Sequence, residues 1–559
     1  MSLSELIQVA RGTVPADLIL KNAKIVNTFN GEIEEGNIAI YQDRIAGVGD
    51  YRTGSEIIDL SGSYVSPGLI NGHVHIESSM LHVARYAEAV IPRGVTGIVT
   101  DLHEIANVLG IPGVEYLLRA ARSLPLDLHL MAPSCVPATA SETSGASLAA
   151  KEVRRMLTFK ECLGLGEMMD FPGVLSSNRQ ALAKLRASRS GTIDGHAPGL
   201  DGRALNAYIA GGISSDHECT RLAEAAEKLS KGMYVMIREG SSEKNLEELI
   251  PLVTDKTYKR CILVVDDRNC SDLLHDGDVD AVIRKAIRLG MDPIRAIQMA
   301  TINPAEHFRI PLIGAVAPGY RANFVVLGDL PSFQSEMVFH DGILVARSGT
   351  PLFTSAIDPD SHATRSMNVK PFTVDHFRIS AEGYRSPIIE IVPNQIITRR
   401  ITVEATIRDG AVVADPQRDI LKAAVVERHR TTGNIGIGLV KGFGLKRGAL
   451  ASSIAHDSHN IVTVGVDDRD LYKAVSTVES LGGGLAVVAD GAVLASLPLP
   501  IAGLLSDQPL TAVVDKFEAV KQAAAGLGST LDDPFASMSF LALPVIPELR
   551  LTDRGLVEV

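Results

Sequence analysis

Residues 65–77 have the sequence VSPGLINGHVHIE, in which an apolar stretch at 65–72 leads directly into His73, Val74 and His75. The apolar stretch has the length and composition of a buried strand. Side chains at positions i and i+2 of a strand point to the same side, so the two imidazoles can bind one metal ion together. The stretch therefore predicts a strand that ends in a pair of metal ligands.

Downstream of this stretch, short apolar segments alternate with amphipathic helical segments. Eight strands that are each followed by a helix are typical of a closed (β/α)₈ barrel. An open doubly wound sheet gives the same alternation, but no G-x-G-x-x-G segment opens a helix after the first strand, which argues against a dinucleotide-binding fold. We expect strands at 65–72, 95–100, 126–132, 163–166, 192–195, 212–215, 233–237 and 261–265, and helices at 80–91, 115–123, 147–160, 177–188, 219–231, 279–289 and 292–307.

The segments on both sides of the barrel have the alternation and the Asn, Gly and Asp turns of short antiparallel strands. We expect residues 1–64 and 308–350 to form the two parts of a small split β-sandwich around a barrel of residues 65–307. A polar stretch at about 350–370 is typical of a linker, and residues 371–559 form a further α+β domain. The predicted fold is an α/β TIM barrel with a split β-sandwich and an additional C-terminal domain.

Composition and charge exclude several classes of protein. The 559 residues include 54 Lys and Arg and 66 Asp and Glu, a formal net charge of −12, so we do not expect a nucleic-acid-binding protein. No segment approaches the roughly 18 uninterrupted apolar residues of a membrane span, and the initial MSLSELIQVARG lacks the features of a secretory signal. We therefore expect a cytoplasmic protein that binds neither nucleic acid nor membranes.

The spacing of the five cysteines argues against a thiolate metal site. No two of them form a C-x-x-C pair, so we expect neither a zinc finger nor a thioredoxin-like site. The His/Cys/Cys zinc site of cytidine-deaminase-type enzymes also needs such a pair. A metal in this protein must therefore be bound by nitrogen and oxygen. The cysteines are Cys135, Cys162, Cys219, Cys261 and Cys270.

Ionisable side chains follow most of the expected barrel strands, at the face where the catalytic residues of such barrels lie. Each of them alone has a structural explanation, such as an N-cap or a surface histidine, but their coincidence in one register favours a metal site. Arg238 and Glu239 after strand seven fit either an ion pair or a site. The other strand ends carry His73 and His75, Asp101 and His103, Glu167, His196, Asp216 and His217, and Asp266 and Asp267.

The six candidate ligands suggest the chemistry. Four histidines and two carboxylates without a thiolate suit Zn²⁺, Mn²⁺ or Fe²⁺. They exceed the needs of one tetrahedral ion, so they fit two ions bridged by Glu167, or one ion with spare groups for proton transfer. A divalent ion lowers the pKa of water towards about 7, and a carboxylate such as Asp266 can accept and deliver that proton. The pattern predicts metal-assisted hydrolysis at an electron-poor carbon.

The strand-end residues and their flanking sequences resemble the amidohydrolase superfamily of metal-dependent hydrolases. APGYRANFVVLGD at 317–329 is similar to the strands that follow such barrels. Over nearly the whole chain, the sequence resembles the adenine deaminase family. The segments that match this family are GLGEMMDFPGV (164–174), SSDHECT (214–220), VVDDRN (264–269), ASSIAHDSHNI (451–461) and LPLPIAGLLSD (497–507), whereas VSPGLINGHVHIE (65–77) carries the wider resemblance to the superfamily.

The resemblance implies the hydrolysis of adenine, a purine base, to hypoxanthine and ammonia. It implies two Mn²⁺ or Fe²⁺ ions per subunit, with Zn²⁺ less favoured, and we expect a homo-oligomer. Glu167 would bridge the two ions at the position where many relatives have a carboxylated lysine, and Asp266 would transfer protons. The implied metal ligands are His73, His75, Glu167, His196, His217 and Asp266, and the implied catalytic residues are Asp266, Glu167, His103 and Asp101.

Two alternatives stay open from the sequence. A dihydropyrimidinase-like amidohydrolase would attack a ring carbonyl with the same residues, although Glu167 in place of a lysine argues against it. A non-catalytic relative that uses the barrel as a scaffold would show gaps among the strand-end residues, and this chain shows none.

A polar segment in the C-terminal domain also has two interpretations. Residues 456–460 read His-Asp-Ser-His-Asn and follow an apolar stretch. The segment either closes over the base at the active site or forms a turn at a domain boundary.

Overall fold

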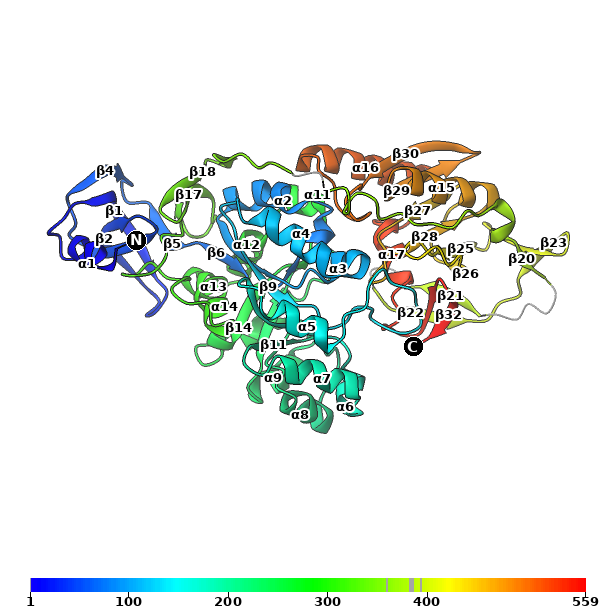
Figure 1. The fold of residues 1–559 in the computed structure, drawn as a ribbon, viewed down its shortest axis with the longest axis horizontal. Coiled ribbons are helices and arrows are strands. Elements are labelled where there is room, and N and C mark those ends of the chain that lie inside the picture. Colours follow the sequence, from blue (N-terminus) through cyan, green and yellow to red (C-terminus); the bar gives the residue numbers. More distant parts are fainter. Residues whose placement is uncertain (1, 358–359, 382–386, 393–394) are drawn as a thin grey trace.

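The structure is a computed structural model that describes residues 2–357, 360–381, 387–392 and 395–559. Figure 1 shows three regions in a row: the N-terminal strands at one end, the strands and helices of the central domain, and the C-terminal domain at the other end. Among the described residues, none of the helices has the length and apolar character needed to cross a membrane.

One nine-stranded sheet combines strands from before and after the central domain. The two parts meet where β5 (Tyr64–Pro67) pairs antiparallel with β16 (Phe324–Leu327), with Val65 opposite Val326. Both valines are fully buried, so the two parts share one core. The other strands are β1 (Ala16–Asn27), β2 (Glu32–Tyr41), β3 (Arg44–Gly49), β4 (Gly54–Asp59), β17 (Ser335–His340), β18 (Ile343–Arg347) and β19 (Thr350–Pro351).

The predicted single strand at 65–72 is wrong, because the chain passes from one sheet to another at Gly68. Before this glycine, β5 belongs to the nine-stranded sheet, and after it β6 (Leu69–Asn71) pairs with β8 (Val95–Thr100). A Cβ atom at position 68 would lie 2.1 Å from Oγ1 of Thr96. Only glycine allows the chain to approach β8 this closely.

Parallel strands in chain order form the central domain. The ladder β6-β8-β9-β10-β11 is followed by the ladder β12-β13-β14, and the amide of Ser214 donates to the carbonyl of Ile193 at 2.9 Å between them. The ring closes where β15 (Asp266–Asp267) pairs with β7 (Val74–His75). The remaining strands are β9 (Asp127–Ala132), β10 (Cys162–Met168), β11 (Thr192–Gly195), β12 (Ser215–Asp216), β13 (Tyr234–Arg238) and β14 (Cys261–Val264).

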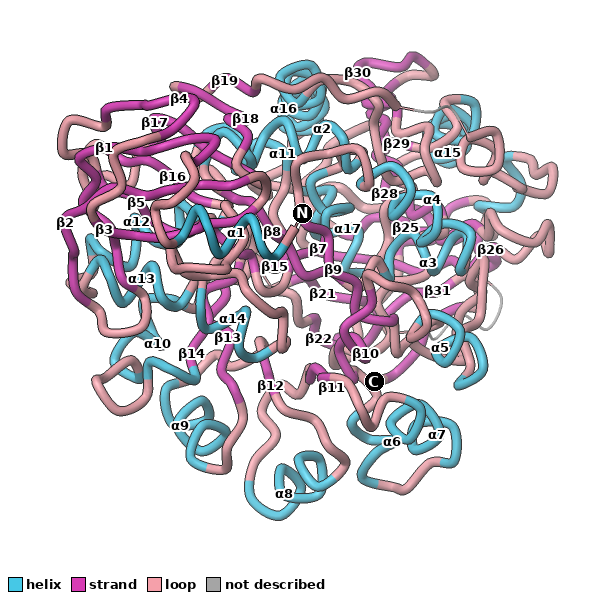
Figure 2. Tube along the Cα trace, turned by 60° about the vertical axis from the view of Figure 1, so that its left-hand side comes forward, coloured by secondary structure: helices cyan, strands magenta, loops and turns pink. Residues whose placement is uncertain are grey.

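The predicted helices cover the outside of these strands. In α12 (Val279–Arg288), the buried positions recur at i, i+3, i+4 and i+7, as expected for a helix with one face on the core. Helices α6 to α9 lie together on the side of the molecule away from α16 (Leu510–Gly526) of the C-terminal domain (Figure 2). Together with helices that were not predicted, this domain contains α2 (Val83–Val90), α3 (His103–Leu109), α4 (Ile111–Ala121), α5 (Ala150–Met156), α6 (Phe171–Leu175), α7 (Arg179–Ala187), α8 (Gly202–Ala210), α9 (Leu222–Ser230), α10 (Leu246–Leu249) and α11 (Cys270–His275).

Two further predicted elements differ from the structure. The helix expected at 292–307 is two helices, α13 (Pro293–Met299) and α14 (Ile302–His307). The carbonyl of Ala300 accepts a hydrogen bond of 2.8 Å from the amide of Ile70 in β6, so it does not continue the helix. The strand expected at 212–215 is only β12, because Gly212 has a φ of +98°, outside the β region.

The C-terminal domain is β-rich and contains an eight-stranded sheet with the order β22-β21-β26-β25-β28-β27-β29-β30. A loop of residues 453–460 connects β27 and β28. The strands of this sheet are β21 (Ile388–Ile391), β22 (Thr398–Ile401), β25 (Ile420–Val426), β26 (Ile435–Lys441), β27 (Ala449–Ser452), β28 (Ile461–Gly465), β29 (Gly484–Ala489) and β30 (Ala492–Pro498), and the helices are α15 (Asp468–Ser480), α16 (Leu510–Gly526) and α17 (Pro534–Leu541).

Direct hydrogen bonds join the C-terminal domain to the central domain. The amide of Ser506 donates to the carbonyl of Met80 at 2.8 Å, and the carbonyl of Ser506 accepts from the amide of His82 at 2.9 Å. On another side, Oδ2 of Asp553 accepts from the hydroxyl of Thr143 at 2.7 Å. The C-terminal domain is therefore fixed over the carboxyl ends of the central strands.

Candidate metal centre

His73, His75 and Asp266 meet where the last and first strands of the ring join. The amide of Asp266 donates to the carbonyl of His73 at 3.0 Å, which fixes the two strand ends together. Oδ1 of Asp266 lies 3.3 Å from Nε2 of His73 and 3.2 Å from Nε2 of His75. All three side chains are buried. The alternation along the strand therefore turns both imidazoles to the same side, as predicted.

Glu167 at the end of β10 connects this group to the histidines of the next two strands. Its Oε1 lies 3.3 Å from Nε2 of His75. Its Oε2 lies 2.6 Å from Nδ1 of His196 and 3.3 Å from Nε2 of His217. The rings of His73 and His217 stack with centroids 4.0 Å apart. One carboxylate is thus shared between two histidine groups, the arrangement expected of a bridging ligand.

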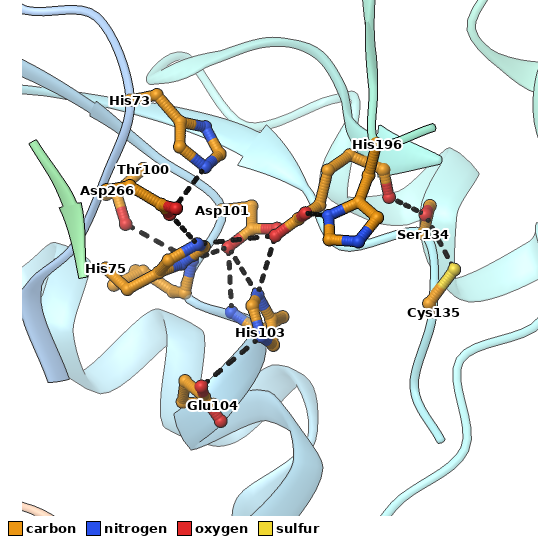
Figure 3. A network of polar contacts seen from close by, with 12 residues as sticks. His73, His75, Thr100, Asp101, His103, Glu104, Ser134, Cys135, His196 and Asp266 are labelled. Atoms are coloured by element: carbon orange, nitrogen blue, oxygen red, sulfur yellow. Dashed lines mark hydrogen bonds and ion pairs between the residues drawn. The ribbon is translucent and has the colours of Figure 1, made fainter. Parts of the chain in front are cut away.

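Asp101 and His103 form a third side of the cluster. Oδ1 of Asp101 lies 2.9 Å from Nδ1 of His103 and 3.4 Å from Nδ1 of His75. Figure 3 shows His75, Asp101 and His103 converging on one point, with His196 approaching from the opposite side. Nδ1 of His103 lies 3.6 Å from Oε1 of Glu167. Both residues therefore contact the predicted ligands directly.

The two acidic candidates are ionised. Burial alone would raise the pKa of Asp266, but contacts with His73 and His75 hold it well below its usual range. Burial acts in the same way on Glu167, and its contacts with His196 and His217 hold its pKa well below normal. Both carboxylates are therefore available as anionic ligands.

The residues present fit a metal centre made of nitrogen and oxygen ligands. Nε2 of His73 and Nδ1 of His75 are buried and form no hydrogen bond within the described residues, a costly state unless another group binds them. Several groups of possible ligand atoms, all within 4.8 Å of one another in each group, overlap here, and Glu167 and His75 each belong to two of them. These ligands suit Zn²⁺, Mn²⁺ or Fe²⁺. Four of the groups are His75, Asp101, His103 and Glu167; His73, His75 and Asp266; His73, Glu167 and His217; and His196, His217 and Glu218, and a further group combines His103, Glu104 and Asp457.

The interpretation of Arg238 and Glu239 as an ion pair with each other is wrong. Adjacent residues at the end of a strand point to opposite sides. Arg238 points into the site, where it donates to Asp266 and binds both oxygens of Glu218. Glu239 instead contacts Lys285 of α12. Arg238 and Glu218 thus border the cluster, and the only sequence signal for Glu218 was its position directly after His217.

Two other acidic residues at the strand ends do not join the cluster. Asp216 forms a buried ion pair of 2.9 Å with Lys228 of α9. Lys228 also donates to the carbonyl of Ala197 at 2.7 Å. These contacts anchor the residues next to His217 and His196. Asp267 accepts a hydrogen bond from Ser78.

The loop of residues 453–460 reaches the cluster from the C-terminal domain. Nδ1 of His456 lies 2.6 Å from Oε1 of Glu104, and His459 contacts the other oxygen of Glu104. Glu104 directly follows His103, and the two side chains lie 3.4 Å apart. The segment is therefore packed against the candidate active site. Sequence reasoning had not identified Glu104 as the residue that holds it.

A cavity of about 470 Å³ lies between the central domain and the C-terminal domain. On one side it is lined by residues that neighbour the cluster, and on the other by the loop and α17. Its walls include Glu104, Asp267, His456, His459, Ser539 and Phe540. A cavity wide enough for a small molecule therefore lies beside the cluster.

Comparison with known proteins identifies the family. Residues 64–345 match the model of the amidohydrolase family, and residues 395–559 match that of the adenine deaminase C-terminal domain. An adenine deaminase of Dehalococcoides mccartyi is 56% identical over 562 residues, with 100% of this chain and 98% of the relative covered. Relatives described as adenine deaminases in Methanothrix thermoacetophila and Carboxydothermus hydrogenoformans are 50% and 48% identical, with the same coverage of both chains. The chain therefore belongs to the adenine deaminase family of the amidohydrolase superfamily.

Proposed function

We propose that the protein hydrolyses adenine to hypoxanthine and ammonia at the cluster around Glu167. The observation that carries this proposal is the sharing of Glu167 between His75 and the pair His196 and His217, with Asp266 beside it. Membership of the adenine deaminase family supports adenine as the substrate.

The ligand groups suggest how two ions would be bound. We assign His73, His75 and Asp266 to one ion, His196 and His217 to the other, and Glu167 to both. When bound, divalent ions would supply Lewis acidity and lower the pKa of water. We favour Mn²⁺ or Fe²⁺ over Zn²⁺, in line with the family resemblance.

Asp266 is the residue that we assign to proton transfer. The reaction forms a bond between the oxygen of water and the ring carbon that bears the amine, and it breaks the bond from that carbon to nitrogen. Asp266 accepts a proton from the attacking water and delivers it to the departing amine. Its carboxylate is ionised and buried, so it can accept the proton in a place from which bulk water is excluded. Asp101 orients His103 at the edge of this site.

Replacement of Asp266 tests this role. Asp266→Asn keeps an oxygen ligand and the size of the side chain but cannot carry the proton. We expect it to retain bound metal and to lose about 10²–10⁴-fold in kcat, measured as ammonia release from adenine. A kcat within a few-fold of that of the unmodified protein would contradict the assignment.

The metal and the substrate class can be tested together. Metal-depleted protein is reconstituted separately with Mn²⁺, Fe²⁺ and Zn²⁺, and ammonia release is measured with adenine, adenosine and cytosine. Hydantoin opening serves as the assay for a dihydropyrimidinase-like enzyme. We expect turnover of adenine, two bound ions at full activity, and the highest rates with Mn²⁺ or Fe²⁺. Turnover of hydantoin alone would support the alternative.

A further inference from the structure

Glu104 holds the loop of residues 453–460 against the central domain. Its side chain is buried, and its two oxygens contact two histidines of the loop, His456 and His459. The carboxylate is ionised: burial raises its pKa, but the two histidines and His103 lower it well below the usual value. Each oxygen of Glu104 therefore accepts from one histidine of the C-terminal domain.

His459 has its two ring nitrogens engaged within the protein. Its Nδ1 accepts a hydrogen bond of 3.3 Å from the amide of Ala455. The proton must then be on Nε2, which donates to Glu104. The carbonyl of His459 accepts from the buried guanidinium of Arg428. These contacts make His459 part of the anchor of the loop.

His456 has only one ring nitrogen engaged. Its Nδ1 donates to Glu104, and within the described residues its Nε2 has no hydrogen-bond partner. The ring stacks on Phe540 of α17 with centroids 4.9 Å apart and planes at 27°. The backbone amide donates to Ser539 at 3.2 Å. The ring is thus held from two sides while it lines the cavity.

His456 carries a positive charge at neutral pH. Burial lowers its pKa, but the carboxylates of Glu104, Asp267 and Asp457 outweigh this effect and bring it to about 9. Both ring nitrogens are then donors. Since Nδ1 is used by Glu104, Nε2–H is the donor that remains for a molecule in the cavity.

The cavity that His456 lines lies beside the candidate metal centre. It borders Glu104 and Asp267, which directly follow His103 and Asp266 in the sequence. A flat base whose reacting carbon lies at the cluster would therefore direct its opposite edge towards the loop. Neutral adenine carries unprotonated ring nitrogens at N1, N3 and N7, each of which accepts a hydrogen bond.

We propose that His456 is a specificity-determining residue of the C-terminal domain, whose Nε2–H donates a hydrogen bond to a ring nitrogen of the purine base, and that Glu104 positions it. This inference rests on the proposed function. It gives the C-terminal domain a direct part in substrate recognition. A donor of this kind binds an acceptor nitrogen and is left as an unpaired polar group when that nitrogen is replaced by carbon.

Two substitutions of His456 separate the proposed contact of its Nε2–H with the base from the contact of its Nδ1 with Glu104. In His456→Asn, the amide nitrogen takes the place of Nδ1 and keeps the contact with Glu104, but no atom replaces Nε2. In His456→Gln, the amide nitrogen reaches the place of Nε2. We expect His456→Asn to raise the KM for adenine about 10-fold to 100-fold with kcat changed less than a few-fold. His456→Gln should restore part of the loss, and His362→Asn, at an exposed histidine, serves as the control.

Analogues of the base identify the contact in the unmodified protein. Inhibition by 1-deaza-, 3-deaza- and 7-deazaadenine is measured for the unmodified protein and for His456→Asn. We expect one analogue to bind the unmodified protein about tenfold more weakly than the other two, and this difference to vanish in His456→Asn. Equal affinity for all three analogues in the unmodified protein overturns the proposal, even if the variant does not fold.

The outcome for the proposed function is read separately. If the unmodified protein releases no ammonia from adenine, the proposed function fails. If it deaminates adenine and His456→Asn has an unchanged KM, only the inference about His456 fails.

Discussion

Arg238 donates a hydrogen bond of 2.8 Å to Oδ2 of Asp266, on the side of the carboxylate away from the histidines. The other oxygen, Oδ1, faces His73 and His75. Arg238 also binds Glu218 through both of its terminal nitrogens. The guanidinium therefore fixes the orientation of Asp266 from behind and neutralises part of the negative charge of the site.

Replacement of Arg238 by lysine should reduce turnover without unfolding the protein. Lysine keeps the charge, but its single ammonium cannot bind Glu218 and Asp266 in the same planar arrangement. We expect Arg238→Lys to lower kcat about 10-fold to 100-fold, the usual cost of losing a group that orients a metal ligand. Steady-state ammonia release checks this, with Arg288→Lys at an exposed position of α12 as the control. Equal kcat values for the two variants would show that Arg238 is not needed to orient Asp266.

Glu167→Gln should reduce both metal content and activity. The amide cannot act as an anionic bridge between the two histidine groups, so we expect fewer than two ions per chain and a kcat at least about 10²-fold lower. Metal analysis after dialysis and ammonia release measure the two effects.

Glu161→Gln provides the matched control for this change. Glu161 directly precedes β10, the strand that carries Glu167, and it contacts Arg122 at the surface. We expect this variant to keep its metal and its turnover. Full metal occupancy in Glu167→Gln would contradict the bridging assignment.

Lys228 and Lys231 allow a test of the buried support beneath the site. Both form ion pairs with a glutamate four residues earlier in α9, but the side chain of Lys228 is fully buried, whereas that of Lys231 is 25% exposed. Lys228→Met leaves Asp216 without its cation, so we expect a loss of about 3–5 kcal/mol in the free energy of unfolding. Lys231→Met should cost about 0.5 kcal/mol or less. Urea unfolding measures the free energy of unfolding of both variants, and it is followed by circular dichroism because the chain contains no tryptophan. Equal losses in the two variants would show that the buried ion pair of Lys228 contributes no more than the exposed one of Lys231.

The residues of the cluster could be picked out from the sequence because each candidate ligand lies at the end of a buried strand. To predict the pair His73 and His75, only the alternation of side chains along a strand is required. To predict Glu167 and Asp266, only their position after an apolar segment is required. Patterns of this kind involve residues close together in the sequence, so they can be recognised without a structure. Their convergence then follows from the barrel, which brings all strand ends to one face.

The other parts of the site depend on contacts between distant residues. The contact of Glu104 with His459 joins positions 355 residues apart, and no local pattern indicates it. The direction of Arg238 depends on the register of β13 with its neighbours. The break at Gly68 depends on a close approach to Thr96. These features arise from tertiary packing, which a single sequence does not reveal.

Glu142 lies in the segment between β9 and α5 that packs against the C-terminal domain. Its carboxyl group is buried close to Asp457. Burial and the neighbouring carboxylate raise its pKa from 4.5 to about 8. In the folded protein the group is therefore protonated at neutral pH, whereas in the unfolded chain it is ionised.

This difference makes stability depend on pH at Glu142. The folded protein keeps a proton that the unfolded chain releases. The contribution of Glu142 to the free energy of unfolding is therefore fully present below pH 4.5 and is lost as the pH rises towards 8, by about 1.4 kcal/mol per pH unit. Glu142→Gln removes this titration. We expect the Tm of the variant, relative to the unmodified protein, to rise steadily between pH 5 and pH 8 in calorimetry. The exposed Glu247→Gln is the matched control for loss of a charge, and a Tm difference for Glu142→Gln that stays constant with pH would show that this carboxyl group is already ionised in the folded protein.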